Sequence, residues 1–341
     1  MNSPILVEVL RGGLVESRHG GAVAVVDADG RGVLALGEVE RAVFPRSAVK
    51  ALQALALVES GAADRYRLTD QELALACASH SGEPGHVATA QSILARAGLD
   101  MTALRCGAHP PIHQPSAAAL ARAGAAPSAL HNNCSGKHAG FLCLAGALGA
   151  EPQDYVEAGH RVQREVRSAI ENASGVALGD EVRAVDGCSA PTWAVPLKNL
   201  ALAFARFGTG RGLGPARDKA AARLRAACAA HPWHVAGSGR FCTDIMRLFG
   251  ARVFVKTGAE GVFCATFPDA GLGVAVKCDD GATRAAEVIM AALIARFCTL
   301  SDGERASLAP FLRPTLHNWN GLAVAALRPT ELVLGQASAK D

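Results

Sequence analysis

The stretch Phe44-Pro45-Arg46-Ser47-Ala48-Val49-Lys50 begins a predicted helix and carries the first candidate catalytic pair of the chain. Pro45 suits a helix start, where its missing N–H is not needed. The Ala- and Leu-rich residues that follow predict a helix over 47–60. Ser47 and Lys50 are three residues apart and therefore share one helix face. A neutral lysine can serve as the base for a serine nucleophile. This spacing alone is common, so a solvated helix start is the simpler interpretation of the pair.

A second motif far downstream favours the catalytic interpretation. Residues 252–255 have the composition of a strand and run directly into Lys256-Thr257-Gly258. The order S-x-x-K and then K-T-G is the signature of serine β-lactamases and penicillin-binding proteins. Only seven of the 34 basic residues are lysine, and Lys50 alone has a serine three residues before it. The two motifs together indicate serine acyl-transfer chemistry.

The predicted elements follow the order strands, helices, strands and helix. Apolar runs and the turn Asp27-Ala28-Asp29-Gly30 predict antiparallel strands over 5–36, with a break at Gly20-Gly21. The middle of the chain predicts helices over 70–77, 86–97, 139–148, 152–174, 196–207 and 215–229, with an irregular stretch over 105–137. After these we expect helices over 242–249 and 284–298 and strands over 252–255, 262–267, 272–276 and 322–325.

This order predicts an α/β (α+β) fold in which a mixed, largely antiparallel sheet is built from both chain ends. A helical lobe is inserted between them. We expect residues 1–45 and 237–341 to form the lobe that contains the sheet, and residues 46–236 to form the helical lobe. The active site is expected between the two lobes.

The composition describes a compact enzyme. The chain has 341 residues, of which 50% are hydrophobic and 19% charged, enough for one large domain or two lobes. The net charge is only +3 and no basic run exists, so neither nucleic acid nor a membrane is an expected partner. The longest apolar run, over 139–150, is too short to span a bilayer. The N-terminus lacks the features of a signal peptide, and the ten cysteines are scattered. We therefore expect a reduced, cytoplasmic protein.

Ser79 lies in a polar segment, Ser79-His80-Ser81, after a predicted helix. It is a candidate counterpart of the second serine of the β-lactamase pattern, paired with Lys256 and passing a proton to the leaving amine. The sequence is Ser-His-Ser and not S-D-N, so the match is one of position and role. An ordinary hydrogen-bonded loop at a helix C-terminus is the alternative.

The segment Cys134-Ser135-Gly136-Lys137-His138 allows three interpretations. Cys134 and His138 could form a nucleophile pair, although no matching signature follows. Cys134 and Cys188 could bind Zn²⁺ if their loops meet. Spacing alone favours buried cysteines and a glycine turn at a helix start. The chain has no H-E-x-x-H motif, and among its histidines His80 and His138 are the best candidates for a role.

Five stretches together resemble the rhizobial-type (class 3) L-asparaginases, a family whose fold is similar to those of glutaminases and serine β-lactamases. The resemblance extends from the N-terminal strands to about residue 295. The stretches are Arg46-Ser47-Ala48-Val49-Lys50, Ser79-His80-Ser81-Gly82-Glu83, His131-Asn132-Asn133-Cys134-Ser135-Gly136-Lys137-His138, Val185-Asp186-Gly187-Cys188-Ser189-Ala190-Pro191 and Lys256-Thr257-Gly258-Ala259-Glu260-Gly261.

The resemblance implies two Ser-Lys pairs, a nearby zinc site and further groups that face the substrate or support the site. The implied pairs are Ser47 with Lys50 and Ser79 with Lys256, the zinc ligands are Cys134, Lys137 and Cys188, and the further groups are Arg46, His80, His138 and Asp186. The resemblance also implies a cytoplasmic homodimer.

The function expected from the motifs and the resemblance is hydrolysis of L-asparagine to L-aspartate and ammonia through a serine acyl-enzyme. Ser47 would attack the side-chain amide, with Lys50 kept neutral by burial and by the Lys256 cation. A glutaminase and a serine hydrolase that recognises β-lactams or peptides remain open. So does a non-catalytic, zinc-dependent ligand-binding protein.

Overall fold

The structure is a computed structural model and describes residues 3–335. Its central element is an eight-stranded sheet in the order β11-β12-β1-β2-β10-β9-β8, with β3 paired to β2 outside this path. All strand pairs of this sheet within the described residues are antiparallel. The strands are β1 (Ile5–Arg11), β2 (Leu14–Asp27), β3 (Gly32–Leu36), β8 (Phe254–Thr257), β9 (Val262–Phe267), β10 (Leu272–Cys278), β11 (Thr315–His317) and β12 (Ala323–Pro329).

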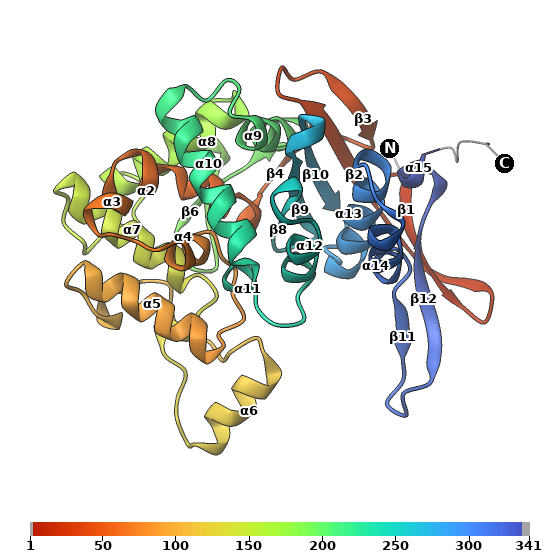
Figure 1. Ribbon diagram of the computed structural model, residues 1–341, viewed down its shortest axis with the longest axis horizontal. Coiled ribbons are helices and arrows are strands. Elements are labelled where there is room, and N and C mark those ends of the chain that lie inside the picture. Colours follow the sequence, from red (N-terminus) through yellow and green to blue (C-terminus); the bar gives the residue numbers. More distant parts are fainter. Residues whose placement is uncertain (1–2, 336–341) are drawn as a thin grey trace.

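The predicted architecture is therefore confirmed, because strands from both ends of the chain form one antiparallel sheet. Strands β1 to β3 precede the helical segment and β8 to β12 follow it. Figure 1 shows most helices of the middle segment on one side and the sheet on the other. Two small two-stranded sheets were not predicted. They pair β4 (Ala42–Val43) with β7 (Val195–Pro196), and β5 (Arg183–Val185) with β6 (Pro191–Trp193).

Strand β2 corrects the break predicted at Gly20-Gly21. It is continuous over 14 residues, pairing with β1 through its first part and with β10 and β3 through its second. A Cβ at Gly21 would collide with the carbonyl oxygen of Lys277 on β10. Glycine is therefore required here for a close approach of two strands, and it does not end the strand.

The helical segment holds most of the helices, and the predicted helix over 47–60 is divided into short pieces. These are η1 (Arg46–Val49), α1 (Lys50–Gln53) and α2 (Leu55–Glu59). The other elements of this segment are α3 (Ala62–Arg65), α4 (Asp70–Ala76), α5 (Pro84–Arg96), α6 (Gln114–Arg122), α7 (Ser135–Leu148), α8 (Arg161–Ser174), α9 (Leu197–Thr209), α10 (Pro215–Ala230), α11 (Pro232–Val235) and α12 (Phe241–Phe249). The C-terminal part adds α13 (Thr283–Phe297), α14 (Asp302–Leu312) and α15 (Glu331–Leu334).

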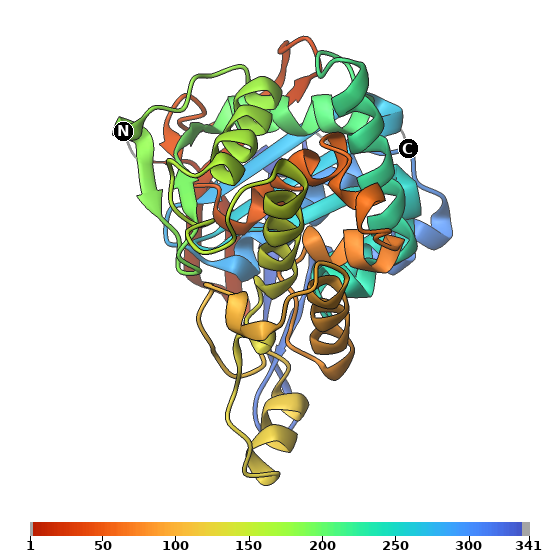
Figure 2. The same ribbon diagram turned by 90° about the vertical axis from the view of Figure 1, so that its left-hand side faces the viewer.

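Helices cover both faces of the sheet. Every residue of β9 is buried, and both α9 and α13 pack against β9 and β10. Helix α9 falls within the range 46–236 assigned to the helical lobe, although it packs on the sheet. The division into lobes stays a prediction. Helix α6 interrupts the stretch predicted as irregular and projects from the rest of the molecule on a long connection (Figure 2). No helix within residues 3–335 is both long and apolar enough to cross a membrane.

Candidate active site

Ser47 lies in a turn whose backbone is strained. Arg46, directly before it, has a φ of 52°, in the left-handed region that residues other than glycine rarely adopt. The Arg46 side chain holds this turn, because its Nε donates a hydrogen bond of 2.5 Å to Asp186 Oδ1. Ser47 is partly exposed, and its hydroxyl has no hydrogen-bond partner in the part of the chain that the structure describes. The strained turn therefore presents a free hydroxyl.

The end of β8 lies directly beside this turn. A Cβ at Gly258 would be 2.6 Å from the Pro45 carbonyl oxygen and 3.3 Å from Ala48, so only glycine fits without a shift. Lys256 lies two residues before Gly258, on the strand whose end packs against this turn. The fold thus brings the S-x-x-K and K-T-G motifs together.

Lys50 contacts Ser79 and not Ser47. Its side chain is only 1% exposed, and Nζ donates hydrogen bonds to Ala78 O (2.6 Å), Ser79 Oγ (2.9 Å) and, more weakly, Asn133 O (3.4 Å). Three acceptors around one nitrogen match the three donors of an ammonium group. The implied pairing of Ser47 with Lys50 stays a prediction, and the contact that the structure shows is between Lys50 and Ser79.

Lys256 is buried as deeply as Lys50 but has a different environment. Its Nζ donates one hydrogen bond, to Thr257 O at 3.0 Å. Burial, followed by the charge of Lys50, lowers the pKa of Lys256 to about 7. No hydrogen bond joins Lys256 to Ser79 within residues 3–335, so the implied pairing of these two residues also stays a prediction. Lys256 is accordingly the better candidate for the neutral amine that the sequence analysis assigned to Lys50.

Cys134, Lys137 and Cys188 meet in the interior, each no more than 4% exposed. Lys137 Nζ donates a hydrogen bond of 3.1 Å to Cys188 Sγ. The Cys134 thiol and the Lys137 cation hold the pKa of Cys188 well below its usual range. Contact with Cys188 and burial raise the pKa of the Cys134 thiol. Burial opposes the charge of Lys137, but the two sulfurs outweigh it and keep the pKa of Lys137 above its usual value.

These three side chains fit the donor set of a zinc site, because two thiolates and a nitrogen suit Zn²⁺. Within the described residues, no three His, Cys, Asp or Glu side chains are grouped to hold a metal ion. A metal here would therefore require Lys137 as its third ligand. Lys137 would have to lose its proton when the metal binds.

The remaining predicted groups surround this cluster. Asp186 connects the Ser47 turn with the cysteine cluster. It accepts the hydrogen bond from Arg46, and the Asp186 Oδ2 atom lies 3.9 Å from Cys188 Sγ. A hydrogen bond of 2.7 Å links His138 Nδ1 to Tyr155 Oη, and the buried His138 Nε2 has no hydrogen-bond partner among the described groups. His80 is fully buried and hydrogen-bonded to Ser135 at 2.9 Å. Burial lowers its pKa well below the usual value.

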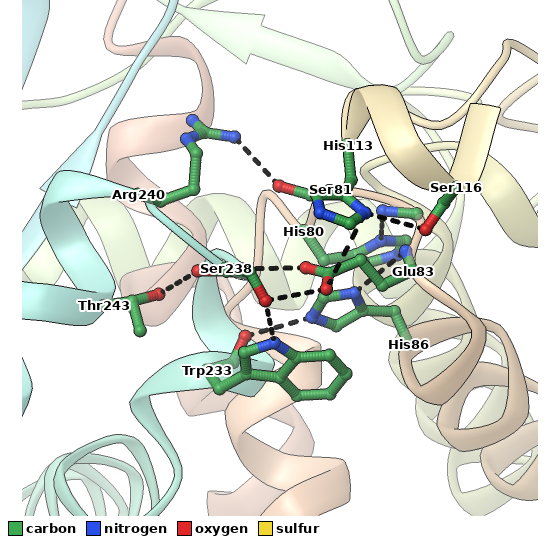
Figure 3. A network of polar contacts seen from close by, with 12 residues as sticks. His80, Ser81, Glu83, His86, His113, Ser116, Trp233, Ser238, Arg240 and Thr243 are labelled. Carbon is green, nitrogen blue, oxygen red and sulfur yellow. Dashed lines mark hydrogen bonds and ion pairs between the residues drawn. The ribbon is translucent and has the colours of Figure 1, made fainter. Parts of the chain in front are cut away.

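Sequence reasoning missed a network beside Ser79. Residues 237–240, which we call the Ser238 turn, were interpreted only as a break before a helix. Figure 3 shows Ser238 and Arg240 of this turn pointing toward Glu83 and Ser81. The repeated glycines of Gly237-Ser238-Gly239-Arg240 were the available signal, because a positive φ and a close approach both require glycine.

Comparison with known proteins identifies the class of this enzyme. The family model described as L-asparaginase II matches residues 7–329, which is most of the chain. The protein therefore belongs to the L-asparaginase II (rhizobial-type) family of amidohydrolases, and the resemblance inferred from the five stretches is confirmed. A search of curated proteins finds no match to this chain.

Solved structures similar to this chain include a β-lactamase and the protein called Mglu. The β-lactamase, from Mycobacterium bovis, is 16% identical, with 82% of this chain and 95% of that chain covered and a TM-score of 0.46. Native Mglu in 4.3 M NaCl is 15% identical, with 76% of this chain and 56% of that chain covered and a TM-score of 0.34.

Proposed function

We propose that this amidohydrolase cleaves the side-chain amide of L-asparagine, yielding L-aspartate and ammonia through a serine acyl-enzyme. Membership of the L-asparaginase II family supports the substrate. The observation that carries the mechanism is the lowered pKa of Lys256, about 7, on the strand whose end packs against the Ser47 turn. An uncharged amine next to a serine is what activation of this weak nucleophile requires.

In the proposed reaction Ser47 Oγ attacks the amide carbon and its proton passes to neutral Lys256. The tetrahedral intermediate then collapses, the C–N bond breaks, and the leaving nitrogen takes a proton to depart as ammonia. Ser79 is suited to pass that proton, because its hydroxyl accepts a hydrogen bond from Lys50 and can itself donate. Water then hydrolyses the ester to L-aspartate and regenerates Ser47. In this scheme Lys50 positions Ser79 through their hydrogen bond. Lys256, and not Lys50, is the base.

Ser79 is the second candidate for the nucleophile, because Lys50 Nζ lies 2.9 Å from its Oγ. A diazoketone analogue of asparagine would label the nucleophile covalently, and peptide mass spectrometry would locate the label. Label on Ser47 supports the proposal, and label on Ser79 exchanges the two roles.

We further propose that zinc binds to Cys134, Lys137 and Cys188. The metal would supply a Lewis acid for donor groups of the substrate. A cytoplasmic homodimer, as the family resemblance implies, is also proposed, and light scattering on the purified protein tests the dimer.

The deciding experiment measures ammonia released from L-asparagine and from L-glutamine by the wild type and by Ser47→Ala. We expect release from L-asparagine, and loss of that release in a variant with an unchanged circular dichroism spectrum. Release from L-glutamine alone would identify a glutaminase. Nitrocefin hydrolysis would indicate a hydrolase that recognises β-lactams. Zinc-dependent ligand binding without product would indicate a binding protein. Full turnover by a folded Ser47→Ala variant would contradict the nucleophile assignment.

A further inference from the structure

Two cations lie near Lys256, because the charges of Lys50 and Arg240 are both among the causes that lower its pKa. A third, Arg46, is already paired with Asp186. An anion placed near Lys50 and Arg240 would therefore be stabilised by their charges.

Arg240 has no carboxylate partner within 4 Å among residues 3–335. Its printed hydrogen bond, from Nη1 to Ser81 Oγ, is long at 3.4 Å. Glu287 is close enough for its charge to interact with that of Arg240, and burial raises the pKa of its carboxyl group, but the two side chains form no ion pair within 4 Å. Arg240 thus offers hydrogen-bond donors to a ligand.

The Ser238 turn that carries Arg240 is fixed by the Glu83 carboxylate. The backbone N–H and the hydroxyl of Ser238 donate to Glu83 Oε1 and Oε2, both at 2.8 Å. Trp233 Nε1 donates to Ser238 Oγ at 3.0 Å. Gly237 has a φ of 114°, and a Cβ there would be 2.7 Å from both Glu83 Oε1 and Ser81 Oγ. The turn is therefore packed directly on the Glu83 carboxylate (Figure 3).

Glu83 meets this turn as a buried anion that has no arginine or lysine partner among residues 3–335, although His113 Nδ1 lies 3.9 Å from its Oε2. It is 7% exposed, and burial alone would raise its pKa. The two hydrogen bonds from Ser238, together with the charges of His86 and His113, outweigh burial and hold the pKa of Glu83 below its usual value. The carboxylate thus serves to position the backbone of residues 237–240, and its charge is not used to neutralise Arg240.

Residues 235–236, directly before the Ser238 turn, are hydrogen-bonded to the segment that carries Ser79. Ser79 N–H donates to Val235 O at 3.0 Å, and Ser81 Oγ donates to Ala236 O at 2.8 Å. The rings of His86 and Trp233 stack with centroids 3.9 Å apart. The position of the Arg240 backbone is therefore fixed relative to Ser79 before any substrate arrives. A preorganised group loses less entropy on binding.

We propose that Arg240, held by the Glu83–Ser238 contact, binds the α-carboxylate of the amide substrate. This inference rests on the proposed function and names the group that selects amino-acid amides. A guanidinium group matches the two oxygens of a carboxylate. Arg46 is less suited, because Asp186 already occupies its Nε.

The test compares L-asparagine with 3-aminopropanamide, which keeps the amine and the amide but lacks the carboxylate. Ammonia release gives kcat/KM for the wild type, Arg240→Gln, Arg240→Lys and the control Arg247→Gln, at an exposed arginine on helix α12, which begins directly after Arg240. We expect Arg240→Gln to lower kcat/KM for L-asparagine by about 10- to 100-fold, the range for hydrogen bonds to a charged group. The preference for L-asparagine over 3-aminopropanamide should fall by the same factor.

Arg240→Lys should recover part of that preference, and Arg247→Gln should match the wild type. Equal loss for both substrates would overturn the inference, because a merely structural role would lower both rates alike. Unchanged L-asparagine kinetics in Arg240→Gln would also overturn it.

Calorimetric titration with L-aspartate separates this inference from the proposed function. If the wild type releases no ammonia from L-asparagine but binds L-aspartate, and Arg240→Gln weakens that binding, the asparaginase proposal fails while the carboxylate site stands. If the wild type binds no L-aspartate, or Arg240→Gln binds it equally well, the carboxylate site is overturned.

Discussion

Replacing Lys256 with methionine removes a buried amine whose pKa is lowered to about 7 by burial and by Lys50. If neutral Lys256 accepts the proton of the nucleophile, kcat/KM must rise with pH as this amine loses its own proton. For a pKa of about 7, the neutral fraction rises from about 10% at pH 6 to about 90% at pH 8. The wild type should therefore gain about tenfold in kcat/KM between these pH values.

The assay follows ammonia release at subsaturating L-asparagine from pH 5.5 to 9. Lys256→Met should lose turnover, whereas the control Lys198→Met, at an exposed lysine on α9, should keep the wild-type profile. A wild-type profile that is flat between pH 6 and 8 would refute the reasoning, as would a rise only above pH 9. Either result would mean that Lys256 is not the base that titrates.

The same substitution should stabilise the fold. The pKa of Lys256 falls from its usual 10.5 to about 7 on folding, so the unfolded chain binds more protons between these values and wild-type stability rises with pH there. Lys256→Met removes this dependence. Its free energy of unfolding relative to wild type should therefore be larger at pH 6 than at pH 9, by about 2–3 kcal/mol. Urea unfolding at the two pH values measures this, and a gain that does not change with pH would contradict the lowered pKa.

Cys188→Ser should lower the zinc content per chain, and the stabilisation that added zinc gives the wild type in thermal unfolding should disappear with it. Cys298→Ser, at a half-buried cysteine after α13, is the control, and equal zinc in both variants would remove Cys188 from the ligand set. Gly258→Ala places a Cβ 2.6 Å from the Pro45 carbonyl oxygen, and overpacking of this kind costs about 1–3 kcal/mol. Chemical denaturation should show this loss together with reduced kcat, whereas Gly303→Ala, in open space on α14, should not destabilise the protein. Wild-type kinetics and stability in Gly258→Ala would show that the turn and β8 can separate without consequence.

Some elements that the sequence analysis missed had a local signal. Helix α14 begins with a capping box, in which Ser301 accepts from Glu304 N–H and the Glu304 side chain accepts from Ser301 N–H. The pattern S-x-x-E before a helix marks this start. Helix α6 likewise has Pro115 in its first turn. Both helices could therefore have been predicted, because the residues that start them are neighbours in the sequence.

The candidate catalytic residues stay a prediction, but the structure shows how the segments that carry them lie. Ser47, Lys50, Ser79 and Lys256 were chosen because two motifs matched a known order, and the fold does bring those motifs together. The contacts that the structure shows within this set differ from the pairs that the resemblance implies. Lys50 reaches the carbonyl of Ala78 and the hydroxyl of Ser79, because the long side chain carries its charge to acceptors that lie outside its own helix. Spacing along a helix gives no information about such acceptors.

The sequence by itself determined the order of the elements, the antiparallel sheet from both ends and the residues that define the family. These properties depend on patterns among residues that are close in the sequence and on short motifs. Both are visible in the linear sequence. The tertiary structure alone decided which lysine has a lowered pKa, how Cys134, Lys137 and Cys188 meet, and that Glu83 holds the turn carrying Arg240. The physical reason is that burial and Coulomb interactions act through space, so they depend on distances between segments that the linear order does not contain.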